Sequence, residues 1–185
     1  MFKRCLMKLF ALTTLSFLLL QNVQAEFEVL RADTRLDQGV YLLNAYFNLD
    51  VGDQPIEALN NGVPLYFQIQ IEIIRERNWW ADKTVAEVAQ RYRLEFHPLS
   101  EQYLVVNLNT GERRSFYYVE EALAHMSLLL DYPLLDRVIV IEGERYLGQI
   151  WVELELGKLP LPLFTSAYFS DDWNLVSEEY QWLLK

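Results

Sequence analysis

The strict alternation of apolar and polar side chains from residue 65 to 73 constrains the fold of this chain most strongly. The apolar set is Leu65, Phe67, Ile69, Ile71 and Ile73, and the polar set is Tyr66, Gln68, Gln70 and Glu72. Side chains two residues apart share one face of a strand, whereas helical spacing would scatter the glutamines and the glutamate around a cylinder. The segment is therefore predicted to be a half-buried β-strand.

Residues 84–97 show the same alternation with the opposite parity, and residues 78–83 are few enough for a hairpin connection. With both apolar faces turned to one core, a tight symmetric turn would place Phe67 opposite Leu94 and Ile69 opposite Tyr92. A helical turn over Thr84–Gln90 is an alternative that the alanine and glutamate content permits. The pattern favours the strand.

Further strands and two helices are predicted from similar patterns. Strands are expected at 27–32, 40–49, 103–108, 137–141 and 145–156, with turns at Asp37-Gln38-Gly39 and Glu142-Gly143-Glu144. Helices are expected at 53–60, with Asp53 as its cap, and at 119–130. The prolines of residues 159–163 predict an extended segment, and Trp173–Leu184 could be a helix or a last strand. Together these patterns predict a mainly β protein, an antiparallel β-sandwich with one or two short helices packed at an edge or end.

The first 25 residues have the order of a secretory signal peptide. Lys3, Arg4 and Lys8 precede a short apolar run from Leu9 to Leu20, and Val23-Gln24-Ala25 supplies small residues for cleavage. The apolar run is too short to span a bilayer as a helix. We therefore expect a signal peptide at 1–25, a single β-sandwich-like domain at 26–185 and a periplasmic location, with membrane contact only through the signal peptide before cleavage.

Charge and cysteine content exclude several classes of protein. The leader holds three of the 16 basic residues and none of the 26 acidic ones, so the mature chain would carry a formal net charge of −13. A surface this negative disfavours nucleic-acid binding. The only cysteine, Cys5, precedes the apolar run, so neither a lipid anchor nor a disulfide is expected in the mature chain.

No catalytic or metal-binding constellation is recognisable in the sequence. His97 and His125 have no second histidine or cysteine at ligand spacing, and no nucleophile elbow, P-loop or dinucleotide fingerprint is present. The acidic pairs Asp50/Asp53, Glu120/Glu121, Glu142/Glu144 and Asp171/Asp172 lack the ligand pattern of a calcium loop. We therefore predict no cofactor, no metal and no catalytic residue, and a hydrolase is the least supported reading.

The adjacent tryptophans Trp79 and Trp80, in a predicted loop, are the most suggestive feature for binding. Trp is favoured both in interface hot spots and in sugar stacking. With the hairpin register above, Arg75, Arg77, Arg91 and Arg93 would lie nearby. In the alternative reading both indoles cover the core and the arginines pair with Glu76, Glu87 and Glu95.

Several phrases of the chain resemble an uncharacterised family of proteobacterial exported proteins classed as a domain of unknown function. They are residues 62–65, 75–80, 92–99, Gln102-Tyr103, 159–163 and 172–175. The resemblance spans nearly the whole mature chain and brings no activity, cofactor or site residue with it. Members of that family are often encoded near membrane sensor kinases, which implies a role in envelope signalling.

Two functions are carried forward from these observations. The first is a non-enzymatic periplasmic interaction module that serves as an accessory to an envelope sensor. The alternative is a glycan- or peptidoglycan-binding module that uses the Trp and Arg residues. The expected partner is accordingly an envelope protein or a glycan.

Overall fold

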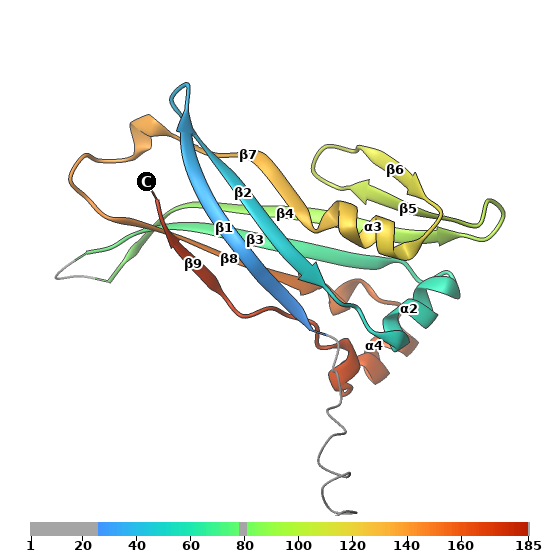
Figure 1. Ribbon diagram of the computed structural model, residues 1–185. Helices are drawn as coiled ribbons and strands as arrows, with labels where there is room; N and C mark the ends of the chain where they lie inside the picture. Colours follow the sequence, from blue (N-terminus) through green and yellow to red (C-terminus); the bar gives the residue numbers. More distant parts are fainter. Residues whose placement is uncertain (1–25, 78–80, 185) are drawn as a thin grey trace, which may run out of the picture.

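The computed structural model describes residues 26–77 and 81–184 and consists mainly of two antiparallel β-sheets. The small sheet has the order β1-β2-β7, formed by β1 (Phe27–Asp37), β2 (Val40–Leu49) and β7 (Leu128–Asp136). The large sheet has the order β6-β5-β4-β3-β8-β9, formed by β3 (Leu65–Arg75), β4 (Lys83–His97), β5 (Gln102–Asn107), β6 (Arg113–Phe116), β8 (Tyr146–Leu154) and β9 (Tyr180–Leu183). The small sheet crosses one face of the large sheet (Figure 1), and β1 contacts β8 and β9.

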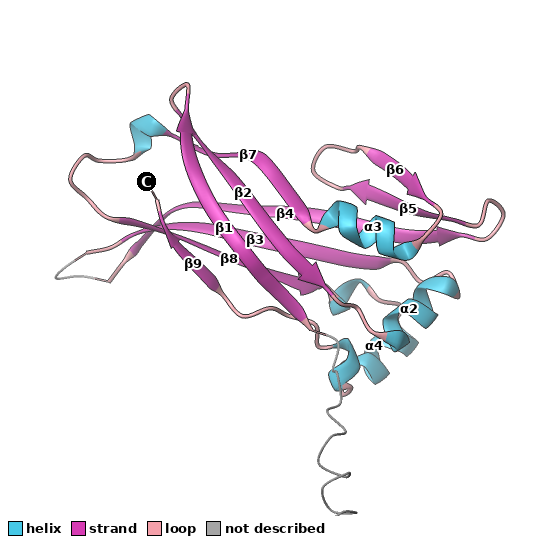
Figure 2. Cartoon of the chain, in the orientation of Figure 1, coloured by secondary structure: helices cyan, strands magenta, loops and turns pink. Residues whose placement is uncertain are grey.

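Short helices gather toward one end of this sandwich (Figure 2). They are α2 (Asp53–Asn60), α3 (Val119–Met126) and α4 (Leu161–Ala167), with the 3₁₀ turns η2 (Leu156–Lys158) and η3 (Asp171–Trp173). A third 3₁₀ turn, η1 (Arg137–Ile139), lies at the opposite end (Figure 2). The predicted fold class is confirmed, although three short helices are present instead of one or two. None of the helices in the described part of the chain has the length and apolar character needed to cross a membrane.

The central strand β3 supplies the middle of the core. All five apolar residues of the alternating run, Leu65 to Ile73, are essentially fully buried. Phe67 stacks on Phe27 of β1 with ring centroids 5.9 Å apart, so the two sheets meet through these side chains. The alternation of the sequence therefore translates directly into one buried face.

The β3–β4 hairpin is confirmed, but its predicted register is wrong by two residues. Phe67 lies opposite Tyr92, and Leu94 lies opposite Leu65. A shift of two residues returns every side chain to the same face, so the hydrophobic pattern cannot distinguish the two registers. The chain adopts the observed pairing with a bulge beside Ile73 and Ile74 and a connection from Glu76 to Asp82.

Three predicted elements are wrong. The predicted helix 119–130 ends at Met126, because Leu128 onward pairs with β2 as β7. The predicted strand 137–141 is the turn η1 and a loop, and β8 pairs with β3 and β9 in place of a local hairpin. The predicted extended segment 159–163 enters α4, since Pro160 occupies the position before this helix and Pro162 fits its first turn.

The predicted cap of α2 is wrong, and the structure decides the C-terminal segment that the sequence left open. Gly52, and not Asp53, occupies the cap position of α2, where no side chain caps the helix. The segment 173–184 combines the end of η3 with the short strand β9. In β9 the Trp182 ring covers Gly148, and its Nε1 donates a 3.3 Å hydrogen bond to Thr34 Oγ1 of β1. The last strand is thus connected to the first.

Candidate functional site

The end of the sandwich opposite the helices is built from loops that hydrogen bonds hold together. The Arg137 amide donates to the Gly39 carbonyl over 2.8 Å, which joins η1 to the β1–β2 turn. The Glu76 amide donates to the Arg145 carbonyl over 3.0 Å, which joins the end of β3 to the start of β8. We call this surface, made of residues 36–39, 76–77, 81–83 and 137–145, the loop end.

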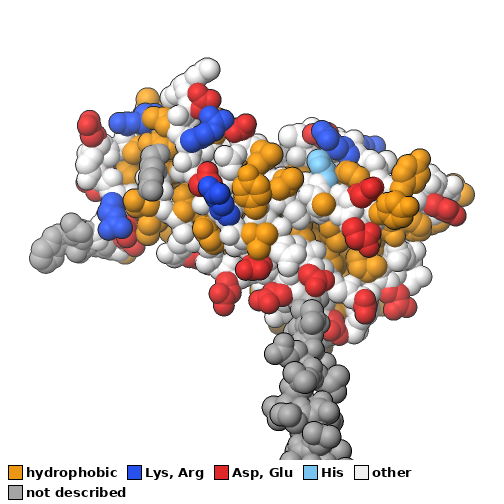
Figure 3. Space-filling view, viewed as in Figure 1, with side chains coloured by type: hydrophobic (Ala, Val, Ile, Leu, Met, Phe, Trp, Pro, Cys, Tyr) orange, Lys and Arg blue, Asp and Glu red, His pale blue; other side chains and the backbone are white. Residues whose placement is uncertain are grey.

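Branched apolar side chains project from the loop end into solvent. Val138 is 90% exposed, Ile139 45% and Ile141 52%, and Leu36 of the β1–β2 hairpin is also exposed. Figure 3 shows this end at the left, where Lys and Arg side chains are interspersed with Asp and Glu, whereas Asp and Glu side chains dominate the lower edge of the molecule. A group of exposed apolar side chains rimmed by charges is typical of an interaction site.

The local sequence explains why these side chains face outward. In a strand, alternate residues of this apolar run would have been buried, but η1 turns the chain so that Val138 and Ile139 both lie outside. Arg137 Nη1 donates a 2.9 Å hydrogen bond to the Val140 carbonyl and fixes the turn. The sequence did not predict this surface, because residues 137–141 have the composition of a buried strand.

Of the predicted binding residues, Arg77 lies at the loop end and Arg75 is the last residue of β3 next to it. Arg75 is paired with Lys83 and Tyr146, and its Nε is buried without a hydrogen-bond partner among the described residues. The Arg77 amide donates a 3.0 Å hydrogen bond to Asp82 Oδ1, which closes the base of the hairpin tip. Trp79 and Trp80 lie outside the described residues, so their role stays a prediction.

The other two predicted arginines lie elsewhere, on the face of the large sheet that the small sheet does not cover. Arg91 Nε is 2.6 Å from Gln68 Oε1 and 3.5 Å from Glu155 Oε1. Arg93 forms an ion pair with Glu95 at 3.2 Å, and Glu95 is one of the partners expected in the alternative reading. Since Arg91 and Lys83 are eight residues apart on β4, about 25 Å separates the two arginine groups. The prediction that all four arginines lie together is wrong.

A ladder of amides and carboxylates covers the centre of this open face. Gln70 is 7% exposed, and its Nε2 donates a 2.7 Å hydrogen bond to Glu87. Burial raises the pKa of the Glu72 carboxyl, and the nearby charges of Glu87 and Glu179 raise it further. Burial also raises the pKa of Glu153, with a smaller contribution from Glu155. The amides of Gln68 and Gln70 are hydrogen-bonded to Glu153 and Glu87, so the ladder leaves few amide groups free for a ligand.

The histidines and acidic pairs do not converge on a reactive centre in the described part of the chain. His97 Nε2 lies 3.2 Å from Glu95 Oε1, and His125 packs against Phe116 with ring centroids 5.4 Å apart. Burial lowers the pKa of His125, and Arg114 lowers it further. Within residues 26–77 and 81–184, no group of three His, Cys, Asp or Glu side chains is placed to hold a metal ion.

The fold and this surface define an antiparallel β-sandwich protein with exposed loops at one end and short helices at the other. A family model described as "Domain of unknown function (DUF4390)" matches residues 24–183, and the chain therefore belongs to the DUF4390 family. Neither the search of curated proteins nor the search of solved structures found a match.

Proposed function

We propose that this chain is a non-enzymatic interaction module of the periplasm that binds an envelope protein through the loop end. The observation that carries the proposal is the exposure of Val138, Ile139 and Ile141 on a turn held by backbone hydrogen bonds. Branched apolar side chains fixed in solvent cost free energy unless a partner covers them. Arg145 ends the same loop and pairs with Glu76 at 3.1 Å, and Arg77 and Lys83 flank the hairpin tip next to Glu76, so these cations would supply a polar rim, as in ordinary protein interfaces.

Export is supported by the order of the first 25 residues and by the extent of the family match. The match begins at residue 24, next to the predicted cleavage after Ala25. The segment before it is therefore separate from the family domain, as a signal peptide would be. The resemblance to exported proteins encoded near sensor kinases supports an envelope sensor as the partner.

Glycan binding is the second candidate, and the geometry supports it less. It depends on Trp79 and Trp80, which lie outside the described residues, and on four arginines that the fold separates into two groups. Arg91 and Arg93 are already engaged with Gln68, Glu155 and Glu95. A sugar on the open face would have to displace these hydrogen bonds.

Photo-crosslinking in the native envelope tests the proposal. A crosslinking amino acid in place of Val138 should capture one discrete partner, and protease treatment should remove the attached mass. Ile141→Asp in the same chain should abolish the crosslink and leave the free energy of unfolding within about 0.5 kcal/mol, because the residue is a surface one.

The matched control is a crosslinker in place of Leu99, which is fully exposed in the β4–β5 turn. It should capture nothing discrete. Equal capture from both positions, or no capture from position 138, would contradict the proposal. An attached mass removed by a glycosidase would replace the protein partner with a glycan.

A further inference from the structure

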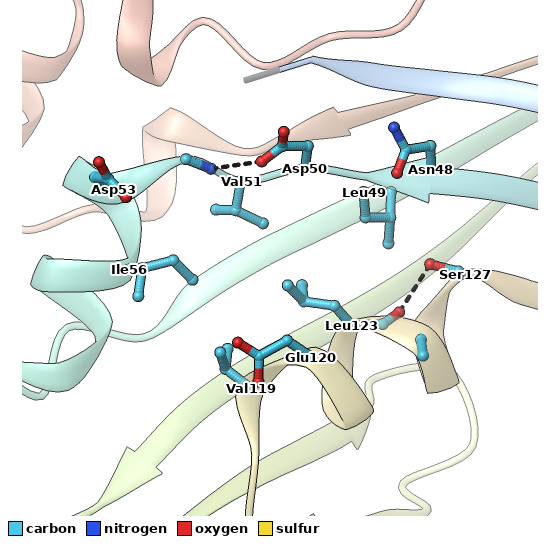
Figure 4. Close-up of a pocket in the computed structure, with 12 residues that line it drawn as sticks. Asn48, Leu49, Asp50, Val51, Asp53, Ile56, Val119, Glu120, Leu123 and Ser127 are labelled. Atoms are coloured by element: carbon cyan, nitrogen blue, oxygen red, sulfur yellow. Dashed lines mark hydrogen bonds between the residues drawn. The ribbon is translucent and has the colours of Figure 1, made fainter. Parts of the chain in front are cut away.

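A groove lies at the helical end of the sandwich, between α3 and the segment that joins β2 to α2 (Figure 4). Its volume is about 550 Å³, within the range of ordinary ligand sites. Leu49, Val51, Ile56 and Leu123 form its apolar floor. Leu49 and Val51 are buried, while Ile56 and Leu123 are half-buried and face the open space.

Carboxylates lie at the rim of this groove, and the Asp50 side chain points to the side of β2 opposite to Leu49 and Val51 (Figure 4). Asp50 and Asp53 come from the β2–α2 segment, and Glu120 comes from the first turn of α3 (Figure 4). All three are exposed, and none forms an ion pair with another described residue. The described residues that line the groove include no Lys or Arg. The fold thus places Asp50 and Asp53 on the same groove as Glu120, which is far from them in the sequence.

Hydrogen bonds hold the walls of the groove in place before any ligand arrives. Gly52 has φ of 71°, a conformation that favours glycine, and its amide donates a 3.2 Å hydrogen bond to Asp50 Oδ1. On the opposite wall, the Ser127 hydroxyl donates to the Leu123 carbonyl over 2.9 Å. The Phe47 amide donates to the Ser127 carbonyl over 2.9 Å, which fixes the end of α3 against β2. The site is therefore preorganised, which lowers the entropic cost of binding.

The chemistry of the groove suits an organic cation attached to an apolar body. Its three carboxylates are not part of any group of metal-ligating side chains in the described chain, and a bare ion would gain nothing from the apolar floor. A lysine or arginine side chain can reach the rim while a neighbouring apolar side chain covers the floor. The exposed rim also leaves room for a longer chain to pass through.

We infer that this groove binds a peptide segment of a partner protein that presents a lysine or arginine next to bulky apolar residues. β2 runs from the loop end to the groove, so about 30 Å separates the two surfaces. The inference therefore does not depend on the loop-end proposal, and the two can fail separately.

Titration of the ¹⁵N-labelled protein with acetyl-Leu-Arg-Leu-amide, followed by NMR, tests the inference. Shift changes should centre on the amides of Gly52, Glu120 and Ser127. Acetyl-Leu-Gln-Leu-amide should bind about threefold or more weakly, because it loses the ion pairs, and acetyl-Ala-Arg-Ala-amide should also bind more weakly. Added salt should weaken only the arginine peptides.

Glu120→Gln should weaken binding of the arginine peptide, whereas Glu121→Gln should not. Glu121 is the matched control, since it is an exposed acid in the same helical turn and does not line the groove. Equal losses for the two variants, equal binding of the glutamine peptide, or no shifts at the groove would each overturn the inference.

Discussion

Glu72 and Glu87 face each other across β3 and β4, and like charges directly opposite in a sheet destabilise it. We predict that Glu72→Gln raises the free energy of unfolding at neutral pH by about 0.5 kcal/mol. The pKa of Glu72 is raised in the folded protein, so the fold binds this proton more tightly than the unfolded chain. The wild type therefore gains stability as the pH falls from the raised pKa to the ordinary value of 4.5. Below pH 4.5 the variant should no longer be more stable than the wild type.

Urea unfolding at neutral pH and below pH 4.5 measures both effects. Glu101→Gln is the control, because Glu101 is an exposed acid in a turn and should change little at either pH. An advantage of Glu72→Gln that persists in acid would show that repulsion between carboxylates is not its cause.

Position 148 has to be a glycine because the Trp182 ring lies directly on it. A Cβ atom at this position would come within 2.2 Å of two Trp182 ring atoms. We predict that Gly148→Ala lowers the free energy of unfolding by about 1–3 kcal/mol, as overpacking usually does. Thermal unfolding measures the loss, and Gly157→Ala is the control because nothing lies within 4 Å of its Cβ position. A Gly148→Ala protein as stable as the wild type would disprove the packing argument.

At the scale of elements, local pattern predicted those segments whose neighbours agree with it. β3 and α2 lie where alternation and turn residues place them, because their faces and ends are set locally. β7 and η1 could not be predicted from the local pattern. Pairing with β2 overrides the helical pattern after Met126. The residues after Arg137 have the pattern of a strand but form a turn and an exposed loop. The groove was invisible for a similar reason, because only tertiary structure brings Asp50 near Glu120.

The hairpin that joins β3 to β4 carries the prediction about the two tryptophans. If one indole contacts a partner, its replacement by Ala should leave the melting temperature nearly unchanged and weaken binding by about 2 kcal/mol or more. If both indoles are core residues, either Trp79→Ala or Trp80→Ala should cost about 3–5 kcal/mol of stability. Melting and partner binding of the two single variants decide between these cases, and severe destabilisation by both would end the contact hypothesis.

For the whole molecule, the decisive prediction concerns export. Protein recovered from its native envelope should begin at Glu26, because Val23 and Ala25 supply the small residues that cleavage needs. N-terminal sequencing measures this directly, and Ala25→Lys should block the processing. Recovery of the intact 185-residue chain would contradict both the cleavage and the proposed location.

The hydrogen bond from Trp182 to Thr34 spans 148 positions of the sequence, and it has a consequence for the order of assembly. β1 and β2 can pair as soon as both are synthesised, but β1 also packs against β8 and β9, near the end of the chain. Contacts between such distant segments form late, because the chain between them loses entropy when the loop closes, before the contacts contribute any free energy. The sandwich can therefore close only when its final residues have left the ribosome. A chain that closes this late would stay open for the export that we propose.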